Sequence, residues 1–193
     1  EVCSYLMDCT DFAEVNARDR MGRTALHCAA AAGHADVCSL LLEHPRFVDA
    51  DAANITGCTA LHSAACAGSL AVCRTLLEHP GFSASDVQDS DGETALHWAA
   101  WNGHALACHM LLEHPGFNAG NACDRHGRTP LHSAAMHGRT EACCAIWKHP
   151  RFGGAEARAH DGSTAWEAAL KAGQYATHSV FQKLRNVPGA GVQ

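Results

Sequence analysis

The chain has 193 residues, of which 47% are hydrophobic and 18% are charged, proportions that are ordinary for a globular protein. Its formal net charge of −6 argues against a nucleic-acid partner, because a nucleic-acid groove is usually basic. Its apolar runs are all far shorter than the roughly 18 residues that cross a bilayer, so no membrane partner is expected.

A tetrapeptide recurs along the chain at a constant spacing of 35 residues. TALH begins at Thr24, Thr59 and Thr94, TPLH begins at Thr129, and a degraded copy, TAWE, begins at Thr164. One glycine precedes each threonine by two residues, and another follows it by nine. Such self-similarity indicates stacked units, each of which can bury its apolar face only against its neighbours.

The expected elements follow this period. Residues 1–12 align with residues 36–47, so we expect the chain to begin within a repeat and to be part of a longer array or protein. Four full repeats, numbered 1 to 4 below, are expected at 13–47, 48–82, 83–117 and 118–152. Residues 153–187 have a more polar second half and are expected to cap the stack, because a terminal repeat needs a polar outer face. Residues 188–193 are expected to be a tail of this single domain.

Within one repeat the residues predict a turn followed by two helices. Gly22 suits the tip of a tight turn because glycine readily adopts positive φ, and Thr24 is a suitable N-cap for a short helix. That helix is expected to end at Gly33. A second helix, with a broader apolar face, should continue to Pro45, which cannot extend it. An extended link then leads to the next turn.

This order of elements resembles the ankyrin repeat. The matching residues of repeat 1 are Asp19, Gly22, Thr24, Leu26, His27, Ala29, Ala30, Gly33, His34, Leu41 and Leu42. The resemblance implies an all-α solenoid of stacked helix–turn–helix units with hairpin loops. Each unit is two residues longer than the usual length of about 33, because HPRF or HPGF follows the second helix.

Recurring aromatic residues are expected to be buried. A phenylalanine ends each of these loops, and the series should form a ladder along the stack: Phe12, Phe47, Phe82, Phe117 and Phe152. Trp147 and Trp166 replace apolar framework residues, so both are expected in the core.

The cysteines are numerous, but most follow the repeat. One position in successive second helices holds Cys3, Cys38, Cys73, Cys108 and Cys143. Neighbouring helices lie about 8–10 Å apart, too far for a disulfide, so these thiols are expected to be buried and reduced in an intracellular, cytoplasmic protein. No metal site and no cofactor are expected. Cys58 and Cys66, near the turns, are the candidates for an exposed thiol.

The histidines also follow the repeat. For the TxLH histidines, the resemblance implies a ring that bonds the turn of its own or the neighbouring unit: His27, His62, His97 and His132. A second set precedes prolines at helix ends, where the helix dipole favours a cation: His44, His79, His114 and His149. His126, His137 and His160 depart from the pattern and are expected on the surface.

No sequence motif of catalysis is present: the chain has no HExxH, no GxSxG and no phosphate-binding glycine loop, which predicts a non-enzymatic protein. The resemblance implies instead that a protein or peptide partner binds the concave face, through turn tips and first helices. The candidate contacts are positions there that vary between repeats: Arg20, Met21, Arg23, Ile55, Asp91, Glu93, Trp98, Trp101, Asn102, Arg125, His126, Arg128, Met136, His137 and His160.

The most specific prediction concerns the aromatic residues at the centre of that surface. Trp98 and Trp101 share one face of a helix, and Trp101 and Met136 are expected to be exposed anchors for a partner lying across repeats 2 to 4. Trp98 either belongs to that patch or fills the gap between adjacent first helices. The charges around the patch alternate in sign, which indicates either a solvated face or a partner with a complementary pattern.

Other interpretations remain open. The chain could be a regulatory or targeting segment of a larger enzyme or channel, or a redox- or metal-responsive protein. We expect a monomer. Asn16 and Asn121 match a link position that is hydroxylated in some ankyrin proteins, whereas the equivalent residues are Asp51, Asp86 and Glu156.

Overall fold

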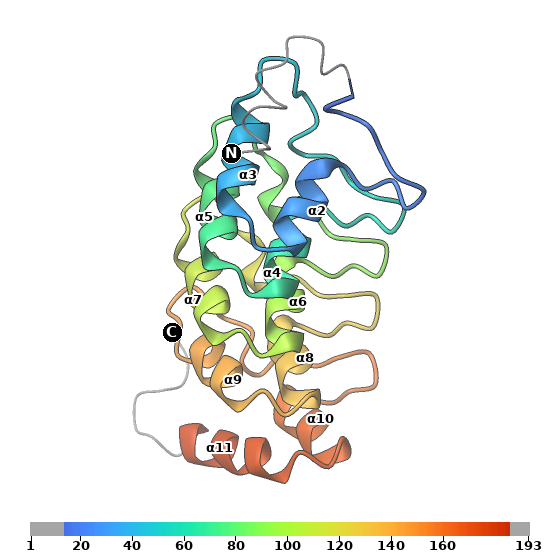
Figure 1. Cartoon of the computed structure of the whole chain (residues 1–193). Helices are drawn as coiled ribbons and strands as arrows, with labels where there is room; N and C mark the ends of the chain where they lie inside the picture. The colour runs from blue at the N-terminus through green and yellow to red at the C-terminus, as the bar shows by residue number, and fades with distance from the viewer. Residues whose placement is uncertain (1–13, 186–193) are drawn as a thin grey trace.

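The computed structural model of the chain describes residues 14–185, so the expected half repeat at 1–12 and tail at 188–193 lie outside the described residues. Figure 1 shows two parallel columns of helices with hairpin loops projecting to one side. One column consists of the first helices, α2 (Ala25–Ala31), α4 (Ala60–Ala67), α6 (Ala95–Asn102), α8 (Pro130–Met136) and α10 (Ala165–Lys171). The other consists of the second helices, α3 (Ala35–Glu43), α5 (Leu70–Glu78), α7 (Ala105–Glu113), α9 (Thr140–Trp147) and α11 (Tyr175–Arg185).

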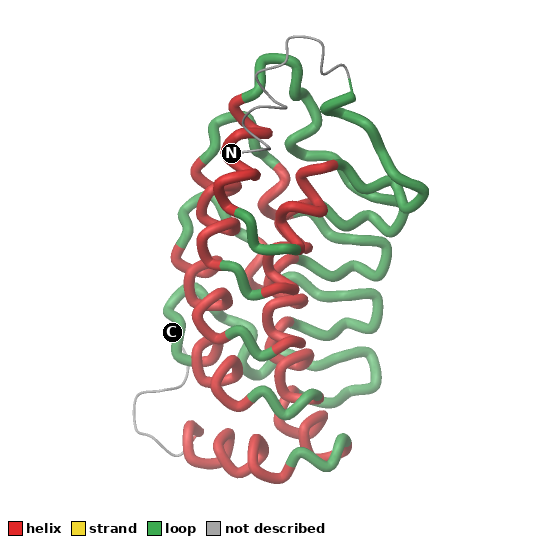
Figure 2. The backbone as a smooth tube through the Cα atoms, in the orientation of Figure 1, coloured by secondary structure: helices red, strands yellow, loops and turns green. Residues whose placement is uncertain are grey.

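The remaining described backbone consists of loops and short turns (Figure 2). Two of the links, expected to be extended, contain 3₁₀ turns, η1 (Ala84–Asp86) and η2 (Ala119–Asn121). Between residues 14 and 185 the only β pairing is an isolated bridge between Arg158 and Thr164. The prediction of an all-α repeat solenoid is therefore confirmed.

Each first helix begins with a capping box in which histidine takes the usual place of glutamate. Thr24 N–H donates to Nδ1 of His27 at 3.2 Å, and the same pairing recurs at Thr59, Thr94 and Thr129. In α10 the residue is Glu167, whose Oε2 accepts the N–H of Thr164 at 2.8 Å. The TAWE sequence is therefore a capping box of the common kind.

The other ring nitrogen of each motif histidine joins neighbouring units. His27 Nε2 donates to the carbonyl of Cys58 in the next hairpin at 3.0 Å, and the later bonds run from His62 to Glu93, His97 to Arg128 and His132 to Ser163. Burial lowers the pKa of these imidazoles, that of His97 to about 4. The predicted structural role of this set is confirmed.

The hairpin loops stack because their tips bond to one another. Ile55 N–H donates to the carbonyl of Met21 at 3.0 Å, and Ser90 N–H donates to the carbonyl of Thr56 at 2.9 Å. Gly57 has φ 79°, and a Cβ there would lie 2.9 Å from Ser90 N. Glycine is therefore required at this position both for the left-handed turn and for the close approach of the next hairpin.

The links between repeats are bonded in a similar way. Asn16 Oδ1 accepts the N–H of Val48 at 3.2 Å, and Asn121 Oδ1 accepts the N–H of Gly153 at 2.9 Å. In the intervening repeats, Asp51 does the same for the N–H of Ser83 at 2.8 Å. Asparagine and aspartate are interchangeable here because only an acceptor oxygen is used. Hydroxylation of Asn16 or Asn121 stays a prediction.

The core confirms the cysteine expectation and corrects the phenylalanine ladder. Within the described residues, the second-helix cysteines from Cys38 to Cys143 are 0% exposed, but the phenylalanines differ. Phe117 (1% exposed) and Phe152 (7%) are buried, whereas Phe47 and Phe82 are only partly buried. The predicted ladder is therefore complete only toward the C-terminus, and Phe12 lies outside the described residues.

The phenylalanines differ in burial because the corresponding loop of the following repeat covers some of them better than others. Arg151 donates to the carbonyls of Leu112 and His114 at 2.7 Å and also to that of Phe117, so it closes this loop over the ring. The residues equivalent to Arg151 over Phe47 and Phe82 are glycines, which leave both rings partly open.

Trp147 and Trp166, each 8% exposed, meet edge to face with ring centroids 6.4 Å apart. Trp147 also contacts Phe181 of α11, at 5.6 Å. The Arg185 guanidinium covers Trp166 at 4.3 Å from the ring centroid. Both tryptophans are in the core, as predicted.

Candidate protein-interaction surface

The hairpin loops and the first helices together form one side of the array, which we call the hairpin face. A pocket of about 610 Å³ opens on it between the hairpins and helices of repeat 4 and the cap. Four of the predicted contact residues line this pocket: His126, Arg128, Met136 and His160. His126, His137 and His160 are all exposed, as predicted.

The cations of the pocket are held by neighbouring aspartates. Arg128 Nε and Nη2 each lie 2.7 Å from Oδ2 of Asp124, whose side chain is 1% exposed. Arg128 Nη1 also lies 3.9 Å from the sulfur of Met136. Lys171 Nζ pairs with Asp161 at 2.8 Å and lowers the pKa of that carboxyl. The pocket therefore presents an apolar floor with charges whose positions are fixed.

Beside the pocket lies an aromatic stack. Trp101, 42% exposed, is stacked between Trp98, with ring centroids 6.5 Å apart, and His137, at 4.7 Å. Trp98 packs against the core while its Nε1 donates to Asp89 at 2.9 Å, so it supports the stack from below. The structure leaves Trp101 open, whereas Met136, which we also expected to be exposed, is partly buried.

The other predicted contacts lie elsewhere or have another role. Met21 (46% exposed) and Ile55 (64%) are on the tips of the first two hairpins, outside the pocket, as are Arg20 and Arg23. Asn102 Nδ2 donates to the carbonyl of Trp98 at 2.9 Å, so this amide is used within its own helix.

The prediction that Glu93 is an exposed acidic contact residue is wrong. Its side chain is only 5% exposed, and burial together with nearby Asp89 and Asp124 raises its pKa to about 7. It is the last residue of its hairpin, at a position whose side chain points toward the neighbouring hairpin. Arg23 at the equivalent position reaches solvent because its side chain is longer.

The alternating charges of the hairpin face are largely paired with one another. Arg23 contacts Asp19 at 2.8 Å, and Arg125 contacts Asp91 at 2.5 Å. The simple pattern of alternating free charges that the sequence indicated is therefore absent from the described hairpins.

The expectation of an exposed thiol near the turns is also wrong. Cys58 is 9% exposed and Cys66 is partly buried, whereas Cys28 and Cys123 are exposed. Cys58 occupies the same inward-pointing position as Glu93, and burial raises the pKa of its thiol to about 11.

The histidines before prolines act as hydrogen-bond acceptors, which sequence reasoning missed. His44 Nδ1 accepts the N–H of Arg46 at 3.3 Å, and the same bond runs from Gly81 to His79 at 3.1 Å and from Gly116 to His114 at 3.2 Å. These bonds hold each ring against its own loop, a role different from the interaction with the helix dipole that we expected. The sequence signal for this role is the constant His-Pro-x-Phe order after each second helix, which places the ring two residues before the N–H that it accepts.

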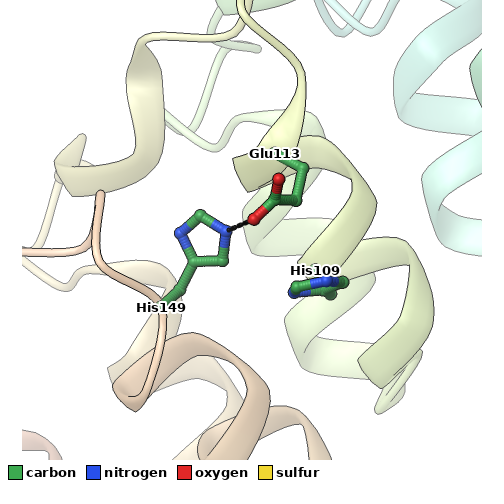
Figure 3. Close-up of side chains that lie close together, drawn as sticks. All are labelled: His109, Glu113 and His149. Atoms are coloured by element: carbon green, nitrogen blue, oxygen red, sulfur yellow. Dashed lines mark hydrogen bonds and ion pairs between the residues drawn. The ribbon is translucent and has the colours of Figure 1, made fainter.

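A group of possible metal ligands was also missed. His109 and Glu113 on α7 lie beside His149 of the loop after α9, and their ligand atoms are all within 4.8 Å of one another (Figure 3). The group is not evident within any single repeat, because His109 and Glu113 belong to repeat 3 and His149 belongs to repeat 4.

In the described part of the chain, no helix is both long and apolar enough to cross a membrane. A search of curated proteins finds no match to the chain. A family model described as ankyrin repeats (3 copies) matches residues 1–86, 47–120 and 81–161. Together with the stacked helix pairs and hairpins, this match shows that the chain belongs to the ankyrin-repeat family.

Proposed function

We propose that this chain is a non-enzymatic module that binds a protein or peptide on its concave side, the hairpin face, across repeats 2 to 4. Ankyrin repeats are generally protein–protein interaction modules and are typically non-catalytic. The observation that carries the proposal is the exposed indole of Trp101, held in a three-ring stack beside the pocket that contains Met136.

The physical support is preorganisation. Trp98 and His137 fix the Trp101 ring before a partner arrives, so binding loses little side-chain entropy there. Aromatic anchors at the centre of an interface commonly contribute most of its energy. A partner suited to this surface places an apolar side chain in the pocket and stacks a flat group on Trp101.

The test compares the wild type, a double variant and a control variant for capture of partners from native lysate and then for affinity with each partner identified. Trp101→Ala with Met136→Ala should weaken binding roughly 30-fold or more, because two anchors are removed. Leu106→Ala is the matched control, since Leu106 is 70% exposed on α7, in the other helix column. Equal affinity of all variants, with unchanged circular dichroism, would reject this binding surface.

We further propose that the protein acts as a monomer in the cytoplasm. The supporting observation is that the described cysteines are free and the core thiols are protonated, since burial raises the pKa of Cys73 and Cys108 to about 12. Sedimentation in reducing buffer should give one species near 20.4 kDa. A larger species at all concentrations would contradict the monomer.

A further inference from the structure

We propose that His109, Glu113 and His149 bind one Zn²⁺ ion at the junction of repeats 3 and 4. His109 and Glu113 are four residues apart on α7 and so share one face of that helix. His149 comes from the loop after α9, and its Nε2 lies 2.9 Å from Oε1 of Glu113. The two imidazoles lie edge to face with centroids 5.4 Å apart, and one ligand atom from each of the three residues lies within 4.8 Å of the other two (Figure 3).

The ligand chemistry selects zinc. Two imidazole nitrogens and one carboxylate oxygen form a common Zn²⁺ set, with solvent in the fourth position. Zinc bonds of about 2.0–2.1 Å in a tetrahedron place ligand atoms about 3.3 Å apart. The present ligand atoms lie within 4.8 Å of one another, and the side chains of His109 and Glu113 are exposed and free to make this small adjustment.

His149 is the fixed ligand. Its side chain is 1% exposed and its Nε2 lies 2.9 Å from Oε1 of Glu113, while its Nδ1 accepts the N–H of Arg151 at 3.3 Å. When Nε2 coordinates the ion, the ring proton moves to Nδ1 and this long hydrogen bond is given up. The proton that now lies between His149 and Glu113 is thereby replaced by the metal.

The other repeats show that the third ligand is not required by the fold. The glutamate and the loop histidine recur in the two preceding junctions, as Glu43 with His79 and as Glu78 with His114. The residue equivalent to His109 is Ser39 in the first of these junctions and Arg74 in the second. The repeat architecture accounts for two of the three groups, and only the junction of repeats 3 and 4 adds a second imidazole.

Zinc bound here would join α7 of repeat 3 to the loop of repeat 4, on the column of second helices and away from Trp101. An ion that binds the folded junction and not the unfolded chain stabilises the fold. This inference is independent of the proposed partner-binding surface, because none of its three residues belongs to that surface.

The test is a titration of the metal-free, reduced full chain with Zn²⁺ alone, after the exposed thiols have been alkylated in the native state. The wild type should bind one tight equivalent, and its melting temperature should rise on addition of zinc. His109→Ser and Glu113→Gln should each weaken binding at least about tenfold and remove that rise. Serine is the residue that repeat 1 carries at this position, so the fold should accept it.

The matched control is His79→Ser, which removes the equivalent loop histidine from a junction that lacks the second imidazole. It should keep the tight zinc equivalent. Co²⁺ bound in place of zinc should show d–d bands without a thiolate charge-transfer band. Absence of a tight equivalent, unchanged affinity in His109→Ser, or a thiolate band would each overturn the site.

Discussion

At the scale of single residues, the histidine of each TxLH motif uses both of its nitrogens. In the case of His97, Nδ1 accepts the N–H of Thr94 at 3.1 Å and Nε2 donates to the carbonyl of Arg128 at 3.0 Å. The Nδ1 bond requires the neutral ring, and burial lowers the pKa of His97 to about 4. Protonation therefore breaks the cap of the helix, whereas the Nε2–H can still donate to the next hairpin.

This arrangement predicts a loss of stability in mild acid. The folded rings have pKa values below the unfolded value of about 6.5, so the unfolded chain binds more protons as the pH falls and the free energy of unfolding decreases. For His97 the loss begins near pH 6.5 and is complete below about pH 4. Urea unfolding between about pH 7.5 and pH 5 should show it.

A substitution of Glu93 provides the control for this pH dependence. Its folded pKa is raised to about 7, so the folded chain binds the extra proton and this group gains stability on acidification, in opposition to the histidines. Glu93→Gln should therefore show a steeper fall than the wild type. A stability that does not change over this range in either protein would contradict the neutral buried rings.

Single residues also show which features the sequence can predict. The roles of Thr24 and Gly22 follow from local rules of capping and turn formation, and that of His27 follows from the resemblance to the ankyrin repeat, so all three were predicted correctly. The burial of Glu93 and Cys58 was not predicted, because it depends on whether each side chain points toward the neighbouring hairpin or toward solvent. A pattern of charges read along the chain contains no information on that direction.

At the scale of elements, the contact between one loop and the preceding helix end decides how well a junction is closed. Arg151 donates to three carbonyls of the preceding repeat, those of Leu112, His114 and Phe117. Where glycine stands at the equivalent position, Phe47 and Phe82 stay partly exposed. One arginine therefore makes this junction tighter than its predecessors.

Arg151→Ala should reduce the free energy of unfolding by about 1–3 kcal/mol, because three carbonyls lose a charged donor. Amide exchange should quicken in residues 112–118 while repeat 1 remains unchanged. Lys148→Ala, a change at an exposed position close by in sequence, is the control. Equal protection of residues 112–118 in both variants would show that the arginine does not close the loop.

The bounds of the helices were predictable, whereas contacts between elements were less so. The ends at Gly33 and Pro45 follow from residue chemistry, and α2 and α3 end at Ala31 and Glu43, close to both. The metal group and the incomplete phenylalanine ladder depend on loops that meet across a junction. Such contacts need coordinates, because equivalent loops differ by a single residue.

At the scale of the whole molecule, the array is a row of units in which each unit contacts only its neighbours. At the C-terminal end of the described array, Phe181 of α11 is 0% exposed and packs on Trp147. Damage to one unit should therefore spread only as far as the adjacent junction.

Phe181→Ala should destabilise the C-terminal units by about 3–5 kcal/mol, because it leaves a cavity beside Trp147. Loss of amide protection should be largest in α10 and α11 and should fade toward α4. Tyr175→Ala, at a 70% exposed position on the same helix, is the control and should have little effect. Uniform loss of protection from α2 to α11 would show instead that the array unfolds as one unit.

The hydrogen bonds of the motif histidines also give the array a direction. Each imidazole donates only to the following hairpin, from His27 to Cys58 and so on to the bond between His132 and Ser163. Glu167, in the same place in the last helix pair, is a carboxylate whose Oε2 only accepts, so it has no proton to offer onward. Removal of the final pair would leave an imidazole N–H without its acceptor, whereas removal of repeat 1 would leave a carbonyl without its donor. The two ends of the row are therefore chemically unequal, and growth or truncation at one end is not equivalent to the same change at the other.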